Sequence, residues 1–165
     1  PWRAFVASLE SNAALVLHPP PWAVVKLQSI VVALLRAGVP ETIAWTIHGL
    51  VALAALGIAF RLWRLPGDAA PEARAVATMA AAFLATPYVL AYDAVALGMA
   101  GVFLARAAMR QGTRPGEQLL VVLAVALPLL LLFSTVYLAV PIGWIVMSGL
   151  ALRRGFGIAA PVARP

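Results

Sequence analysis

The sequence predicts an all-α fold, a polytopic membrane helical bundle of about five transmembrane spans preceded by an interfacial amphipathic helix. Two observations predict it. Of the 165 residues, 64% are hydrophobic and only 11% are charged, whereas an ordinary soluble domain is about half apolar and about a quarter charged. Long apolar runs also alternate with short turns that carry arginine, proline or glycine, and a helix needs an apolar run of about 20 residues to cross a bilayer.

The composition excludes several classes of function. The chain has no cysteine, which excludes disulfides, thiolate catalysis and cysteine-ligated metals. The sequence has no metal-ligand motif, nucleophile elbow or phosphate-binding glycine loop, so we expect no metal and no cofactor. The net charge of +6 suggests nucleic acid as a possible partner. The arginines, however, lie at the ends of segments and form no patch, so we expect no nucleic acid to bind.

Residues 1–40 are predicted to be an extracytoplasmic or interfacial segment. The chain begins at Pro1 without a basic-then-apolar leader, so we expect it to be a piece of a longer protein whose N-terminal half precedes it. Pro19 to Pro21 break any helix there, and residues 22–37 follow as a short amphipathic helix. Its apolar side holds Leu27, Ile30, Val31 and Leu34 and its polar side holds Lys26, Ser29 and Arg36. It is too short to span a bilayer, so we expect it to lie in the interface.

Residues 41–154 are predicted to be the transmembrane bundle. The first span runs from about Glu41 to Trp63, because Pro40 and Glu41 suit a helix start and arginines mark its end. The second covers about Ala73 to Leu90 and the third about Asp93 to Met109. Both have small residues at helical spacing, which predicts that the two pack as a close hairpin: Ala73, Ala77, Ala81 and Ala85 in one, and Ala94, Gly98, Gly101 and Ala105 in the other.

The last two spans and the basic residues complete the predicted topology. The fourth span begins near Glu117 and ends between Phe133 and Tyr137, the fifth ends at Arg153-Arg154, and residues 155–165 are predicted to be a disordered cytoplasmic tail. Nine of the twelve basic residues lie at one end of these spans, so that end and the C-terminus are predicted to be cytoplasmic. The other three, Arg3, Lys26 and Arg36, lie at the opposite, extracytoplasmic end, together with residues 1–40 and the tip of the hairpin.

The hairpin tip, Thr86 to Asp93, is the first candidate site. Asp93 either orients a sugar hydroxyl or a catalytic partner, or caps the N-terminus of the third span, and the two roles are compatible. Tyr88 and Tyr92 either bind a sugar or belong to the aromatic belt at the membrane surface. Pro87 most simply ends the second span.

The other candidates lie in the predicted extracytoplasmic segment. Lys26 and Arg36 either bind a lipid phosphate or lie among the headgroups. Gln28 and Ser29 either add hydrogen bonds to that site or form a polar packing face. His18 either contacts a phosphate or transfers a proton, or it is an ordinary loop histidine. His48, inside the first span, is expected to form an interhelical hydrogen bond.

Three stretches resemble a known family. These are Trp2-Arg3-Ala4-Phe5 with Ser8-Leu9, then Lys26 to Ser29 running on to Leu35-Arg36-Ala37-Gly38, and Thr86-Pro87-Tyr88 with Tyr92-Asp93. In order and spacing they resemble the C-terminal part of bacterial membrane glycosyltransferases of family 87, the polyprenyl-phosphate-mannose-dependent α-mannosyltransferase relatives with the GT-C architecture. The resemblance covers most of residues 1–110, and the last two spans match only in hydrophobicity.

The resemblance implies an enzyme fragment that moves a sugar, mannose in the first instance, from a polyprenyl-phosphate donor to an acceptor at the outer face of the bacterial inner membrane. Such enzymes use a carboxylate base in the first extracytoplasmic loop, which would lie upstream of this chain, so no catalytic residue is expected here. Lys26, Arg36 and His18 would then hold the carrier phosphate, and Tyr88, Tyr92 and Asp93 would shape the sugar site. A transporter or flippase segment and a non-catalytic membrane scaffold are the alternatives.

Overall fold

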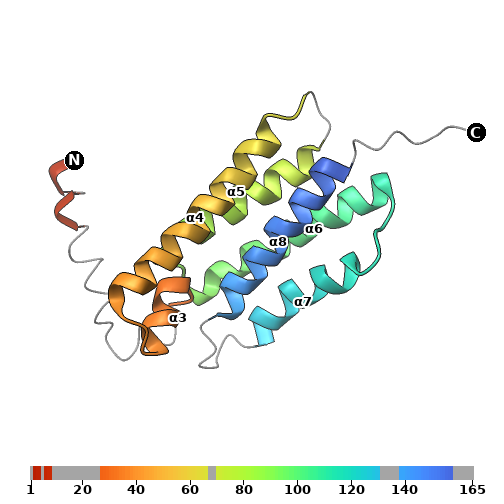
Figure 1. Cartoon of the computed structure of the whole chain (residues 1–165). Coiled ribbons are helices and arrows are strands. Elements are labelled where there is room, and N and C mark those ends of the chain that lie inside the picture. Colours follow the sequence, from red (N-terminus) through yellow and green to blue (C-terminus); the bar gives the residue numbers. More distant parts are fainter. Residues whose placement is uncertain (1, 5, 9–26, 67–69, 131–137, 158–165) are drawn as a thin grey trace, which may run out of the picture.

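The computed structural model describes residues 2–4, 6–8, 27–66, 70–130 and 138–157, and this part of the chain is all-α (Figure 1). Within the described residues after position 26, five long helices and two short ones follow one another: α3 (Ile30–Arg36), α4 (Glu41–Trp63), α5 (Pro71–Ala85), the 3-10 helix η1 (Ala91–Ala94), α6 (Val95–Gln111), α7 (Glu117–Leu130) and α8 (Ala139–Phe156). Helix α5 is central and packs against α4, α6 and α8, while α7 packs against α6 and α8. The long helices alternate in direction, as Figure 1 shows.

The helix boundaries follow local signals. Helix α4 begins after Pro40 with Glu41 in its first turn and ends with Arg61 in its last turn, which confirms the bounds of the helix predicted for the first span. Helix α5 begins with Pro71 and ends at Ala85, where Thr86 is extended, because the residue before a proline disfavours the helical conformation. The predicted second span, which ran to Leu90, was therefore wrong at its C-terminal end.

The segment before α4 differs from the prediction. The helix predicted over 22–37 begins only at Ile30, with Ser29 as its N-cap, and residues 30–33 are buried. Leu27 is not helical but forms an isolated antiparallel bridge with Leu90. Helix α3 packs on α4, so its apolar side faces the bundle, whereas the prediction turned that side toward the membrane. Lys26 and His18, and the predicted end of the fourth span, lie outside the described residues.

Alanines fill much of the core, and many large apolar side chains lie on the outside. Ala73, Ala77 and Ala81 of the α5 stripe are buried, as predicted. The large residues on α4 form an exposed row along its length: Ile43, Ile47, Leu50, Leu53, Leu56, Phe60 and Trp63. Water-soluble proteins rarely expose so long an apolar face, whereas small residues at helix contacts are typical of membrane bundles.

The predicted small face of the third span does not pack on α5 as expected. A Cβ on Gly101 would lie 3.2 Å from Cγ2 of Val125, so Gly101 faces α7, and Gly98 has nothing within 4 Å of that position. Ala105 is exposed. Helices α5 and α6 do pack together, as the hairpin prediction expected, but not all four small residues of the third span lie at that contact, because Gly101 faces α7 and Ala105 is exposed.

Two helical stretches of the described part are long and apolar enough to cross a membrane, Glu41–Trp63 and Ala91–Gln111. Helix α5 has 15 residues, about 22 Å at 1.5 Å per residue. Helix α8 continues through Gly155 and Phe156, two residues into the predicted tail, and residues 158–165 lie outside the described range.

One end of the bundle carries eight arginines of the described residues, and we call it the arginine end: Arg61, Arg64, Arg74, Arg106, Arg110, Arg114, Arg153 and Arg154. Ion pairs tie its helices together. Buried Glu72 at the start of α5 lies 2.9 Å from Arg110 and 3.5 Å from Arg106 of α6. Burial opposes ionisation of the Glu72 carboxyl, but its hydrogen bonds and these two guanidinium charges prevail and hold its pKa below the usual range.

The second ion pair joins the two C-terminal helices. Arg154 of α8 and Glu117 at the start of α7 are 1% and 3% exposed. Arg154 donates to both carboxylate oxygens of Glu117, to Gln111 Oε1 at 3.3 Å and to the carbonyl of Gly112 at 3.2 Å. One guanidinium therefore connects α6, α7 and α8.

Candidate functional site

The candidate site lies at the end of the bundle opposite the arginine end, where two distant segments pair. Leu27 and Leu90 form the antiparallel bridge, and the Gln28 N–H donates to the Val89 carbonyl at 2.7 Å. We call residues 27–29 with 86–93 the paired segments. Their pairing brings Gln28 and Ser29 beside the predicted hairpin tip, which sequence spacing alone did not predict.

The acid and the tyrosines of the hairpin tip take different positions. The Asp93 carboxylate accepts the backbone N–H of Leu90 at 2.8 Å, and the Asp93 N–H donates to the Leu90 carbonyl at 2.9 Å. Asp93 therefore caps the start of η1 from inside the helix, three residues after Leu90, which confirms the predicted capping role while moving it off the N-cap position. Tyr88 packs on the cluster formed by Leu27, Val31, Val32 and Ala44, whereas Tyr92 is 62% exposed.

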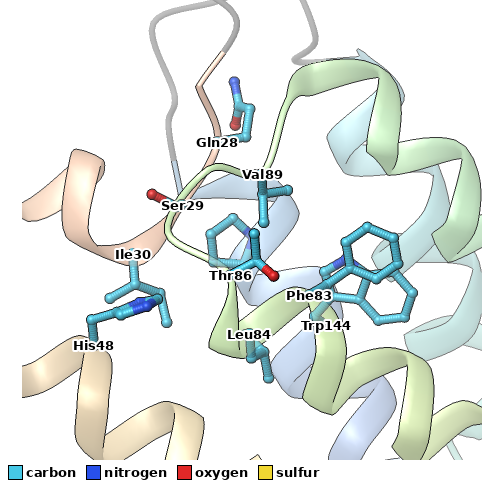
Figure 2. A pocket seen from close by; sticks show the side chains of 10 residues that line it. Gln28, Ser29, Ile30, His48, Phe83, Leu84, Thr86, Val89 and Trp144 are labelled. Atoms are coloured by element: carbon cyan, nitrogen blue, oxygen red, sulfur yellow. The ribbon is translucent and has the colours of Figure 1, made fainter. Parts of the chain in front are cut away.

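Three buried polar side chains line a small cavity beside the paired segments (Figure 2). Its volume is about 10 Å³, which is about the space of one water molecule. Gln28, His48 and Trp144 are all buried, and both amide atoms of Gln28, Nδ1 of His48 and Nε1 of Trp144 have no hydrogen-bond partner. This cavity is too small for a sugar.

The surrounding residues fix the cavity walls. His48 lies close to the backbone of Ala85, which places α4 beside the end of α5, and the interhelical hydrogen bond of His48 stays a prediction. The Thr86 hydroxyl donates to the Ala82 carbonyl at 2.8 Å. Phe83 stacks on Trp144 with ring centroids 4.7 Å apart, and Figure 2 shows the two rings side by side.

The remaining predicted residues are less closely grouped. Ser29 accepts the Val32 N–H at 3.4 Å as the N-cap of α3, so its hydroxyl serves the local fold. Arg36 is in the last turn of α3 and is exposed. Within the described ranges, no group of three or more His, Asp or Glu is placed to hold a metal ion.

Sequence reasoning missed Trp144 and the Gln28 contact. Trp144 comes from α8, more than 50 residues beyond the hairpin tip in the chain, and its buried indole gives no local sequence signal. A buried glutamine next to a β-bridge is equally invisible in a pattern of apolar spacing.

Comparisons with protein-family models, with curated proteins and with solved structures found no match for this chain.

Proposed function

We propose that this chain is part of a membrane-embedded glycosyltransferase that takes a sugar, mannose in the first instance, from a polyprenyl-phosphate donor. The observation that carries the proposal is the pairing of residues 27–29 with residues 86–93. Two of the three stretches that resemble family 87 thus lie side by side, although about 60 residues separate them in the sequence. Segments that shape one site must meet in space, and these do.

The distribution of side chains supports a membrane location with this orientation. The exposed apolar row on α4 and the two helices of sufficient length fit a lipid environment. The eight arginines gather at one end, which the positive-inside rule assigns to the cytoplasm. The paired segments then lie at the outer face of the bacterial inner membrane, where lipid-linked sugars are used.

The roles proposed for the residues follow from their positions. Tyr92, exposed, and Tyr88, half-buried, would contact the sugar, and exposed Arg36 would contact the carrier phosphate. Lys26 and His18 are proposed for the same phosphate by resemblance alone. Asp93 supports the site through its cap, and the catalytic base would come from the preceding part of the protein.

A transporter or flippase is less well supported. Such proteins place ionisable groups near the midplane of the membrane and use broken helices. In α4, the longest described helix, the only ionisable residue away from the ends is His48.

The proposal is tested with the intact protein in proteoliposomes, using a radiolabelled polyprenyl-phosphate-mannose donor and measuring label transferred to acceptor. Arg36→Gln should reduce transfer at least about tenfold, because a hydrogen bond to a charged group contributes about 1.5–3 kcal/mol. Arg64→Gln, an exposed arginine at the other end, is the matched control and should leave transfer unchanged. Lys26→Ala should reduce transfer similarly.

Two results would count against the proposal. If Arg36→Gln and Lys26→Ala both kept full transfer, the site assignment would be wrong. If the intact protein moved a labelled solute across the vesicle without forming any transfer product, the transporter reading would replace it.

A further inference from the structure

A groove opens between α6 and α7 at the arginine end, away from the candidate site. Its volume is about 340 Å³, within the range of small-molecule sites. Its walls are mostly apolar, with Leu104, Ala105, Ala108, Met109, Val121 and Val122, and its polar lining residues are Thr113, Gln118 and Glu117, whose carboxylate is paired with Arg154. Met109 is 82% exposed and Val122 60% exposed, so the groove opens toward the outer surface of the bundle.

A second, more polar hollow continues the groove over the turn between the two helices. It measures about 440 Å³ and is lined by residues 113–116 with Gln118 and Leu119. Thr113 and Gln118 line both hollows, so the two are contiguous. Together they change from apolar between the helices to polar at the turn.

Arg114 lines the polar hollow, and Arg153 lies beside it through its contact with Pro115. Arg114 donates to the Arg153 carbonyl, and Arg153 Nη1 donates to the Pro115 carbonyl at 3.4 Å. Neither is paired with a carboxylate of the described residues, whereas Arg106 and Arg110 pair with Glu72 and Arg154 pairs with Glu117. Carbonyl oxygens orient these two side chains without cancelling their charge.

We propose that this groove binds an anionic phospholipid, with one acyl chain between α6 and α7 and the phosphate beside Arg114 and Arg153. Basic pockets between helices at the cytoplasmic surface suit anionic headgroups, and an apolar channel that ends in cations matches the polarity of a single amphiphile. A docked helix would need an apolar surface along its whole length, which the polar turn does not offer. The proposal requires a membrane at the arginine end but does not depend on the transferase reaction.

The test uses native mass spectrometry of the purified full chain in detergent, titrated with phosphatidylglycerol or phosphatidylcholine. Phosphatidylglycerol should form adducts at lower concentration. The double variant Arg114→Gln/Arg153→Gln should weaken these adducts about 25-fold, because each arginine near a membrane surface contributes roughly fivefold to anionic lipid affinity. Arg61→Gln/Arg64→Gln removes the same charge from the same end and should leave them nearly unchanged.

Two further variants separate the parts of the site. Ala105→Phe fills the apolar groove, keeps both arginines and should also weaken the adducts. Arg114→Lys/Arg153→Lys keeps the charge and should retain most of the binding, which guards against a loss caused by misfolding.

Three outcomes would overturn the proposal. Equal weakening by both glutamine pairs would mean that net charge alone attracts the lipid. Equal binding of phosphatidylcholine would remove the role of the arginines. If millimolar inorganic phosphate displaced the bound phosphatidylglycerol as effectively as added phosphatidylglycerol does, the groove would be a site for free phosphate. Because none of these measurements uses sugar transfer, their failure is distinguishable from failure of the proposed function.

Discussion

The buried Glu117–Arg154 pair offers the sharpest test of how the three C-terminal helices are held together. In Arg154→Met the apolar replacement leaves the Glu117 carboxylate, which is 3% exposed, without its main partner, and it removes the donor to Gln111 and to the Gly112 carbonyl. Breaking a buried ion pair from one side costs about 3–5 kcal/mol. The free energy of unfolding should fall by that amount.

The assay is reversible unfolding of the purified chain in mixed micelles, followed by tryptophan fluorescence and extrapolated linearly to zero denaturant. The double variant Glu117→Met/Arg154→Met should recover most of the loss, because an apolar pair can replace a buried ion pair at little or no cost. Arg64→Met, an exposed arginine at the same end, should change stability by no more than about 0.5 kcal/mol.

If Arg154→Met lost less than about 1 kcal/mol, or if the double variant were as unstable as the single one, the pair would not be what joins α6, α7 and α8.

Three other predictions follow from the same structure. Gly143→Ala should lower the free energy of unfolding by about 1–3 kcal/mol, because the added Cβ would lie 2.9 Å from the Ala124 carbonyl oxygen. The control Gly149→Ala, whose added Cβ meets nothing within 4 Å, should be neutral or stabilising. Equal effects of the two substitutions in thermal unfolding would contradict the close approach of α7 and α8. Asp93→Ala should lower the free energy of unfolding by about 1 kcal/mol, because the cap is lost. Asp93→Asn keeps a hydrogen-bond acceptor and should keep most of the stability. Equal losses of stability in chemical denaturation would show that the charge matters and the cap does not. Because the pKa of Glu72 is lowered in the folded protein, the Glu72 carboxylate should stabilise the fold fully above the ordinary carboxyl range. This stabilisation should be lost as the pH falls through the lowered pKa. Glu72→Gln should therefore make unfolding less sensitive to acid, and an unchanged dependence of stability on pH would refute this prediction.

Local sequence signals predicted the structure correctly where a segment's conformation depends mainly on its own residues. Helix α4 was predicted correctly from Pro40 and Glu41 at its start and the arginines at its end. The end of α5 at Ala85 followed from a local rule, since Thr86 precedes Pro87. The prediction that Pro87 ends the second span was correct, whereas the predicted bound at Leu90 was wrong. The exposed apolar face and the segregation of arginines were likewise visible in the sequence.

The missed features all depend on partners far apart in the chain. The bridge between Leu27 and Leu90 turned a predicted helical residue into an extended one, because the pairing supplies backbone hydrogen bonds that helical periodicity does not reveal. Topology placed Glu117 at the same end as Arg153 and Arg154, yet only the packing of α7 on α8 decides that Arg154 is the buried partner. In the candidate site, the cap by Asp93 was predicted from local chemistry, while the cavity beside Gln28 and Trp144 was not.

The most direct test of the central claim is the orientation of the bundle in the membrane. Because this chain has no cysteine, single cysteines report on their own position once any cysteine elsewhere in the intact protein has been replaced. Tyr92→Cys, at an exposed site in the paired segments, and Arg64→Cys, at the arginine end, would be treated in whole spheroplasts with a membrane-impermeant maleimide. We predict that Tyr92→Cys is labelled from outside and that Arg64→Cys is labelled only after the membrane is permeabilised. Labelling of both from outside, or of Arg64→Cys alone, would contradict the proposed placement of the candidate site at the outer face.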